Sequence, residues 1–129
     1  MCTEKVAVLS KYTVKIKRIY ETADEHDGFR VLVDRLWPRG VSKERAQVDQ
    51  WCKDIAPSTQ LRKWFNHDPE RFEEFAHRYT EELDANREAV DMLTALFAKY
   101  STVTLLYAAK DPKVNHALVL KEYLQNLLA

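Results

Sequence analysis

The sequence predicts an α/β fold, in which a small, mainly parallel sheet is flanked by helices. Two runs of β-branched and aliphatic residues, near 30–37 and 102–109, are typical of strands buried on both faces. Helical patterns lie between these runs and after the second one. Helices that alternate with buried strands favour a parallel sheet, because a crossover helix returns the chain to the same edge. A helix-rich α+β fold is the alternative.

The first strand is predicted over residues 12–20, where apolar and basic residues alternate. Val14, Ile16 and Tyr20 fall on one face and two lysines fall on the other, which indicates a half-buried strand. A polar loop over 21–28 follows it and ends in a turn.

The second strand begins in the run 30–37 and is ended by Pro38 and Gly40. Ser42 then has the side chain of a helix N-cap, which predicts one or two helical turns. The stretch 48–55 is ambiguous, since its apolar residues fit helical spacing but could also pair as a strand.

Ser58 is predicted to cap a short helix that runs through Trp64 and Phe65. A longer helix begins at Asp68-Pro69, where the carboxylate caps free N–H groups and proline occupies the first helical position. Its apolar residues step by three and four up to Tyr100. A continuous helix of that length is unusual, so a break is expected near 84–86.

The last strand covers 102–109, and a terminal helix follows it with apolar residues from Val114 to Leu128. Asp111-Pro112 repeats the cap signature before that helix. The chain has 129 residues, which is the usual length of one domain, so we assign 1–129 to a single domain.

Composition excludes several classes of protein. The two glycines, Gly28 and Gly40, are too far apart to form a glycine-rich phosphate loop. The net charge is zero, which argues against nucleic-acid binding, and no apolar run reaches the ~18 residues of a membrane span. We therefore expect a cytoplasmic protein.

The cysteines and histidines lack the spacing of metal ligands. Cys2 and Cys52 form no C-x-x-C pair, and no two histidines show zinc-enzyme spacing. We expect no metal and assign no cofactor.

Charged residues follow the two buried strands, where a parallel sheet would bring them to one edge. Arginine side chains there would supply forks for phosphate or carboxylate, and a turn at a glycine would let them face one place. The predicted ligand-binding residues after the first buried strand are Arg35, Trp37, Arg39 and Gly40, and those after the second are Tyr107 and Asp111.

Three side chains are candidates for proton transfer, namely Asp34, His67 and Lys110. Arg62, near His67, is a further candidate for the anion site. The competing interpretation is structural: Asp34 pairs with Arg35 or Arg39 and only pins the loop.

The motif 30–40, RVLVDRLWPRG, resembles the opening motif of YeaO-like proteins, a branch of the DUF488 family of unknown function. Further blocks match in order, at 51–58, 61–69, 104–111 and the Asn115-His116-Ala117 segment. This resemblance implies a compact cytosolic α/β domain of bacteria or archaea and implies no reaction.

Two functions from different classes fit these residues. The first is an enzyme or binding protein for a small anionic ligand such as a nucleotide or sugar phosphate. The second is a non-catalytic module that recognises a protein partner. Nucleic-acid binding is a weaker third possibility.

Overall fold

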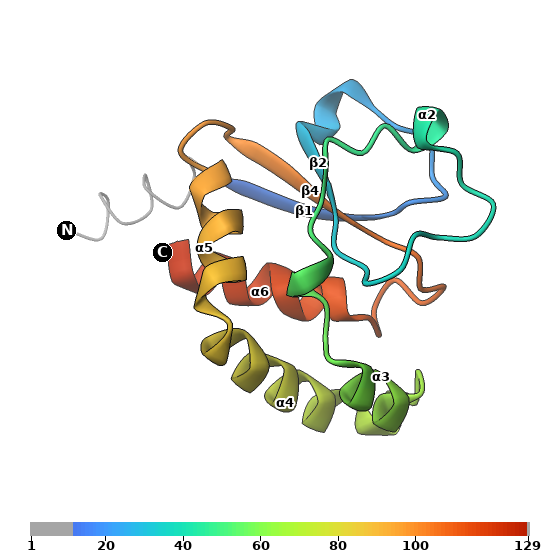
Figure 1. The fold of residues 1–129 in the computed structure, drawn as a ribbon, viewed down its shortest axis with the longest axis vertical. Helices are drawn as coiled ribbons and strands as arrows, with labels where there is room; N and C mark the ends of the chain where they lie inside the picture. Colours follow the sequence, from blue (N-terminus) through green and yellow to red (C-terminus); the bar gives the residue numbers. More distant parts are fainter. Residues whose placement is uncertain (1–11, 129) are drawn as a thin grey trace.

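A computed structural model of the chain describes residues 12–128, in which four strands form one parallel sheet (Figure 1). The strand order is β1-β4-β2-β3, so the last strand along the chain lies in the middle of the sheet. The strands are β1 (Thr13–Arg18), β2 (Phe29–Leu32), β3 (Gln50–Trp51) and β4 (Thr102–Tyr107). The predicted α/β class is confirmed, and the α+β alternative is wrong.

The two faces of the sheet carry different layers, because successive side chains of a strand point in opposite directions. Val31 and Leu105 pack into the larger core, against the helices on one face. Leu32 and Leu106 point to the opposite face, where Ala46 of the short helix α2 (Lys43–Ala46) covers them. Figure 1 shows the helices that follow residue 58 gathered on the same side of the strands, with α2 on the other side.

The helices follow the predicted order. They are α2 (Lys43–Ala46), α3 (Thr59–Phe65), α4 (Phe72–Ala85), α5 (Arg87–Leu96) and α6 (His116–Leu128), with short 3-10 turns η1 (Glu25–Asp27), η2 (Lys53–Ile55) and η3 (Pro69–Arg71). Asp68 caps η3, which leads directly into α4. The predicted break is confirmed at Asn86, whose side chain donates to the Asp54 carbonyl at 2.9 Å.

The second predicted strand is shorter than expected, because β2 pairs with its neighbours only as far as Leu32. The next backbone N–H, of Val33, still donates to the Leu106 carbonyl at 3.1 Å. One step further, the Asp34 carboxylate accepts the Ala108 N–H at 3.0 Å, where a main-chain carbonyl would continue the ladder. A side chain therefore ends the strand.

Three details of the predicted strands and helices are wrong. Tyr20 lies beyond β1 and is 44% exposed, while Ile19 takes the buried position. Tyr100 lies after α5, exposed, and stacks on Phe29 with ring centroids 4.4 Å apart. The terminal helix begins at His116, not directly after Asp111-Pro112. Tyr20 and Tyr100 lie where a strand or a helix has ended, so the periodicity of that element no longer applies to them.

The ambiguous stretch 48–55 is divided between a strand and a 3-10 turn. Gln50 and Trp51 pair with β2, and the chain then turns through η2. No helix within residues 12–128 is long and apolar enough to cross a membrane.

Candidate ligand-binding site at the sheet edge

A pocket of about 590 Å³ lies where β2 and β4 end. It is formed by the loop after β2, the start of α3, and the loop between β4 and α6. Because β2 and β4 are parallel neighbours, their carboxyl ends open at the same edge of the sheet. The pocket brings together eight of the predicted site residues: Asp34, Arg35, Trp37, Arg39, Arg62, His67, Lys110 and Asp111.

Asp34 is held at the base of this pocket by groups outside the arginine loop. Its Oδ2 accepts the Ala108 N–H at 3.0 Å, and its Oδ1 lies 3.1 Å from Nε2 of His116. Within residues 12–128 it forms no ion pair with Arg35 or Arg39. The structural alternative of an Asp34–arginine pair is therefore wrong.

Arg35 is anchored by backbone carbonyls and has an unused donor. Its Nη2 donates to the carbonyls of Ala56 and Pro57, both at 3.3 Å. Its Nε is buried and has no hydrogen-bond partner within residues 12–128. A buried guanidinium N–H without a partner costs free energy, so this group is suited to an additional acceptor.

The loop after β2 folds back on itself and presents Arg39 outward. Trp37 donates its indole N–H to the Val41 carbonyl at 2.7 Å, and its ring packs edge-on against Trp51. The Tyr20 hydroxyl donates to the Arg39 carbonyl at 3.2 Å. This hydrogen bond fixes the backbone of Arg39, and Arg39 itself is exposed at the rim of the pocket.

Arg62 lies in the middle of α3, and His67 lies just beyond its C-terminal end. Ser58 caps this helix as predicted, accepting the Leu61 N–H, and Arg62 follows one residue later on the exposed side. After the helix, Asn66 and His67 adopt left-handed backbone angles, with φ of 49° and 55°. This double turn reverses the chain and leaves His67 exposed at the pocket.

Asp111 and Lys110 lie in the exposed loop that closes the other side. The Asp111 carboxylate accepts the N–H groups of Lys113 and Val114, at 2.8 and 3.1 Å. It thus caps a turn, whereas Asn115 accepts the Leu118 N–H and caps α6. The prediction that Asp111 caps the terminal helix is wrong by one turn.

Gly40 and Tyr107 do not line this pocket. Gly40 does form a turn, with φ of +73°, but it lies in a separate hollow beside Tyr20. Tyr107 is buried within the sheet, and burial raises the pKa of its hydroxyl. Its sequence neighbours Ala108 and Ala109 reach the pocket instead.

His116 and Asn115 are the site residues that sequence reasoning missed. The sequence indicates no chemical role for His116, yet its imidazole lies 3.1 Å from Asp34 and lines the pocket. Its Nε2 also lies 3.0 Å from the Val33 carbonyl oxygen. The available signal was the Asn115-His116-Ala117 block, which belongs to the motifs that carry the family resemblance.

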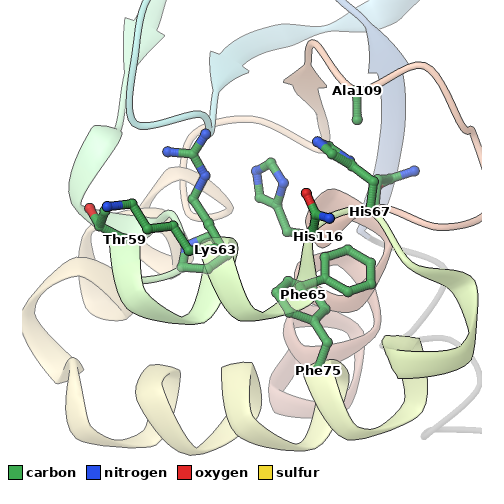
Figure 2. A pocket seen from close by; sticks show the side chains of 11 residues that line it. Thr59, Lys63, Phe65, His67, Phe75, Ala109 and His116 are labelled. Atoms are coloured by element: carbon green, nitrogen blue, oxygen red, sulfur yellow. The ribbon is translucent and has the colours of Figure 1, made fainter.

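A second hollow of about 300 Å³ continues from the first, between α3 and α6 (Figure 2). The two share Arg62, His67 and His116. Phe65 and Phe75, stacked with centroids 4.1 Å apart, form its apolar wall. Within residues 12–128, no three His, Cys, Asp or Glu side chains lie close enough together to hold a metal ion.

A comparison with models of known protein families identifies the family of this chain. A family model described as "Inactive DUF488-N3 subclade" matches residues 13–129. The chain belongs to the DUF488 family.

Curated relatives of this DUF488 protein cover most of its length. An uncharacterised protein of Mycobacterium tuberculosis H37Rv is 48% identical over 111 residues, which are 86% of this chain and 92% of the relative. The uncharacterised protein YeaO of Escherichia coli K12 is 45% identical over 114 residues, 88% of this chain and 98% of the relative. The resemblance to the YeaO-like branch is confirmed. No solved structure matches this DUF488 protein.

Proposed function

We propose that this protein binds a small anionic ligand, such as a nucleotide or sugar phosphate, in the pocket at the carboxyl edge of the sheet. One observation carries the proposal: four cationic side chains line this pocket, and none forms a salt bridge with a carboxylate within residues 12–128. They are Arg35, Arg39, Arg62 and Lys110.

The two carboxylates of the pocket do not neutralise this charge directly. Asp34 accepts the Ala108 N–H and lies 3.1 Å from His116 Nε2, and Asp111 accepts two backbone N–H groups. Cations gathered in a concave site attract anions, and arginine forks match the geometry of phosphate or carboxylate. The buried, unpartnered Nε of Arg35 supplies one directed donor.

Binding without turnover is favoured over catalysis. The subclade that the chain matches is described as inactive, and Oδ2 of Asp34 is occupied by the Ala108 N–H. Recognition of a protein partner is less well supported, because a hollow lined by cations fits a small anion better than a flat contact.

The test is titration calorimetry with inorganic phosphate, a nucleoside monophosphate and a sugar phosphate at low ionic strength. The double variant Arg39→Ala/Arg62→Ala removes two exposed cations, and we expect at least a tenfold loss of affinity, about 1.4 kcal/mol. The matched control is Arg45→Ala/Arg87→Ala, which removes the same charge outside the pocket. Equal affinities for the two double variants would contradict the proposal.

A further inference from the structure

The imidazole of His116 faces two oxygen atoms with the same nitrogen. Its Nε2 lies 3.0 Å from the Val33 carbonyl oxygen and 3.1 Å from Asp34 Oδ1. A backbone carbonyl can only accept a hydrogen bond, and an ionised carboxylate likewise. Nε2 therefore carries a proton and donates it, which in the neutral ring leaves the lone pair on Nδ1.

This orientation of the ring is held from several sides. The second oxygen of Asp34 is fixed by the Ala108 N–H at 3.0 Å. Tyr79 packs against the imidazole in an edge-on arrangement, with centroids 6.3 Å apart. A ring flip would take Nε2 away from the Val33 carbonyl oxygen, to which it is hydrogen-bonded, whereas Asp34 Oδ1 has no hydrogen-bond partner within residues 12–128 in the present orientation.

The second nitrogen, Nδ1, is directed away from these oxygens because the two nitrogens of an imidazole point in divergent directions. No group within residues 12–128 forms a hydrogen bond with it. His116 lines both connected hollows, and its ring lies near the middle of the view in Figure 2, between Lys63 and His67. A hydrogen-bond acceptor thus lies in a pocket that is also lined by Arg35, Arg39, Arg62 and Lys110.

Building on the proposed anion site, we infer that His116 Nδ1 accepts a hydrogen bond from the ligand, so that the ligand carries an O–H or N–H donor beside its anionic group. Arg35, Arg39 and Arg62 can satisfy only acceptors. A protonated phosphate, or an organic anion with a neighbouring hydroxyl, satisfies both kinds of group. An anion that has only acceptor atoms places an oxygen against the Nδ1 lone pair.

The test compares inorganic phosphate with sulfate by titration calorimetry at pH 8 and low ionic strength. Both are tetrahedral dianions under these conditions, but only phosphate retains an O–H. We expect the wild-type protein to bind phosphate at least tenfold more tightly than sulfate, since one hydrogen bond to an otherwise unsatisfied acceptor is worth about that factor. Equal affinities would overturn the role of His116 and leave the anion site standing. Binding of neither anion would overturn the proposed function and this inference with it.

The variant His116→Gln keeps an N–H for the Val33 carbonyl but has no acceptor at the position of Nδ1. It is expected to lower phosphate affinity to that of sulfate and to leave sulfate affinity unchanged. His77→Gln, on the exposed side of α4, is the matched control and should keep the phosphate preference. Nitrogen-15 NMR of the wild-type protein gives a check that needs no variant: a neutral His116 protonated on Nδ1 would overturn the inference.

Discussion

Glu82 of α4 accepts two hydrogen bonds from Ser58, one from its backbone N–H at 2.8 Å and one from its hydroxyl at 2.6 Å. The same hydroxyl oxygen accepts the Leu61 N–H and caps α3. One carboxylate thus links the start of α3 to α4. The position of Arg62, one residue beyond Leu61, depends on this link.

Replacement of Glu82 by alanine is expected to destabilise the protein by about 2 kcal/mol, because hydrogen bonds to a charged acceptor contribute about 1.5–3 kcal/mol. Ser58→Ala should cost a similar amount, since it removes the cap as well. Urea unfolding of both single variants and of the double variant measures their coupling. Strictly additive losses would contradict the link between the two residues.

Gly28 and Gly40 form a natural pair for comparison, because both have positive φ angles, +66° and +73°. A Cβ at Gly28 would lie 2.2 Å from the Thr102 carbonyl oxygen, whereas nothing lies within 4 Å of one at Gly40. Gly40→Ala should therefore cost only the backbone strain, about 1–2 kcal/mol. Gly28→Ala should cost clearly more or prevent folding.

Thermal unfolding of the two glycine variants side by side checks this difference. Similar melting temperatures for Gly28→Ala and Gly40→Ala would show that the backbone at Thr102 moves away without cost. The wild-type protein is the common reference.

Asp27 makes the stability depend on pH. Burial alone would raise the pKa of this carboxyl, but hydrogen bonds from the Asp24 N–H, Lys17 and Arg30 outweigh burial and lower the pKa below the ordinary 3.8. A lowered pKa in the folded state stabilises the protein above pH 3.8, and this contribution is lost as the pH falls through the folded-state value.

The variant Asp27→Asn lacks this titration. The difference in free energy of unfolding between wild type and variant should be constant near neutral pH and shrink below about pH 3.8. Denaturant unfolding between pH 2.5 and 7 measures it. If the difference in free energy of unfolding grows as the pH falls, the lowered pKa of Asp27 does not stabilise the protein.

Tyr79 connects α4 to the segment that carries the Arg35 anchors. Its hydroxyl is buried and donates to the Ile55 carbonyl at 2.6 Å, and burial raises its pKa well above 10. Tyr79→Phe leaves that carbonyl without its donor, so we expect a loss of about 1–3 kcal/mol. Denaturant unfolding measures the loss.

Alkaline titration of the wild-type protein tests the same contact independently. The phenolate absorbance of Tyr79 should appear only when the protein unfolds. Ionisation of all six tyrosines near pH 10 in a folded protein would contradict its burial.

Local sequence patterns were sufficient to predict most of the helices and strands. The caps at Ser42, Ser58 and Asp68 begin a helix or 3-10 turn where predicted, because a cap needs only its own side chain and the next three residues. The break at Asn86 is predicted by the length of the helical pattern and by the polar Asn86 at a position where an apolar residue was due. Patterns failed where an element had ended, as at Tyr20 and Tyr100.

The candidate site was partly accessible to the same reasoning. Charged residues directly after buried strands indicated one edge, and the parallel pairing of β2 with β4 does bring Asp34 and Lys110 to a common pocket. Tyr107 does not line the pocket because it still pairs with Arg18 as the last residue of β4, and its side chain packs into the larger core.

The alternation of buried strands with capped helices is therefore enough to define an α/β chain and to locate its charged sheet edge, since both depend on interactions between near neighbours in sequence. The sequence does not predict which side chains pair with these functional groups, because the partners are distant in sequence. Asp34 with His116 and Ser58 with Glu82 lie 82 and 24 residues apart. Strand order and helix packing bring these residues together, and no local periodicity of the sequence predicts either pairing.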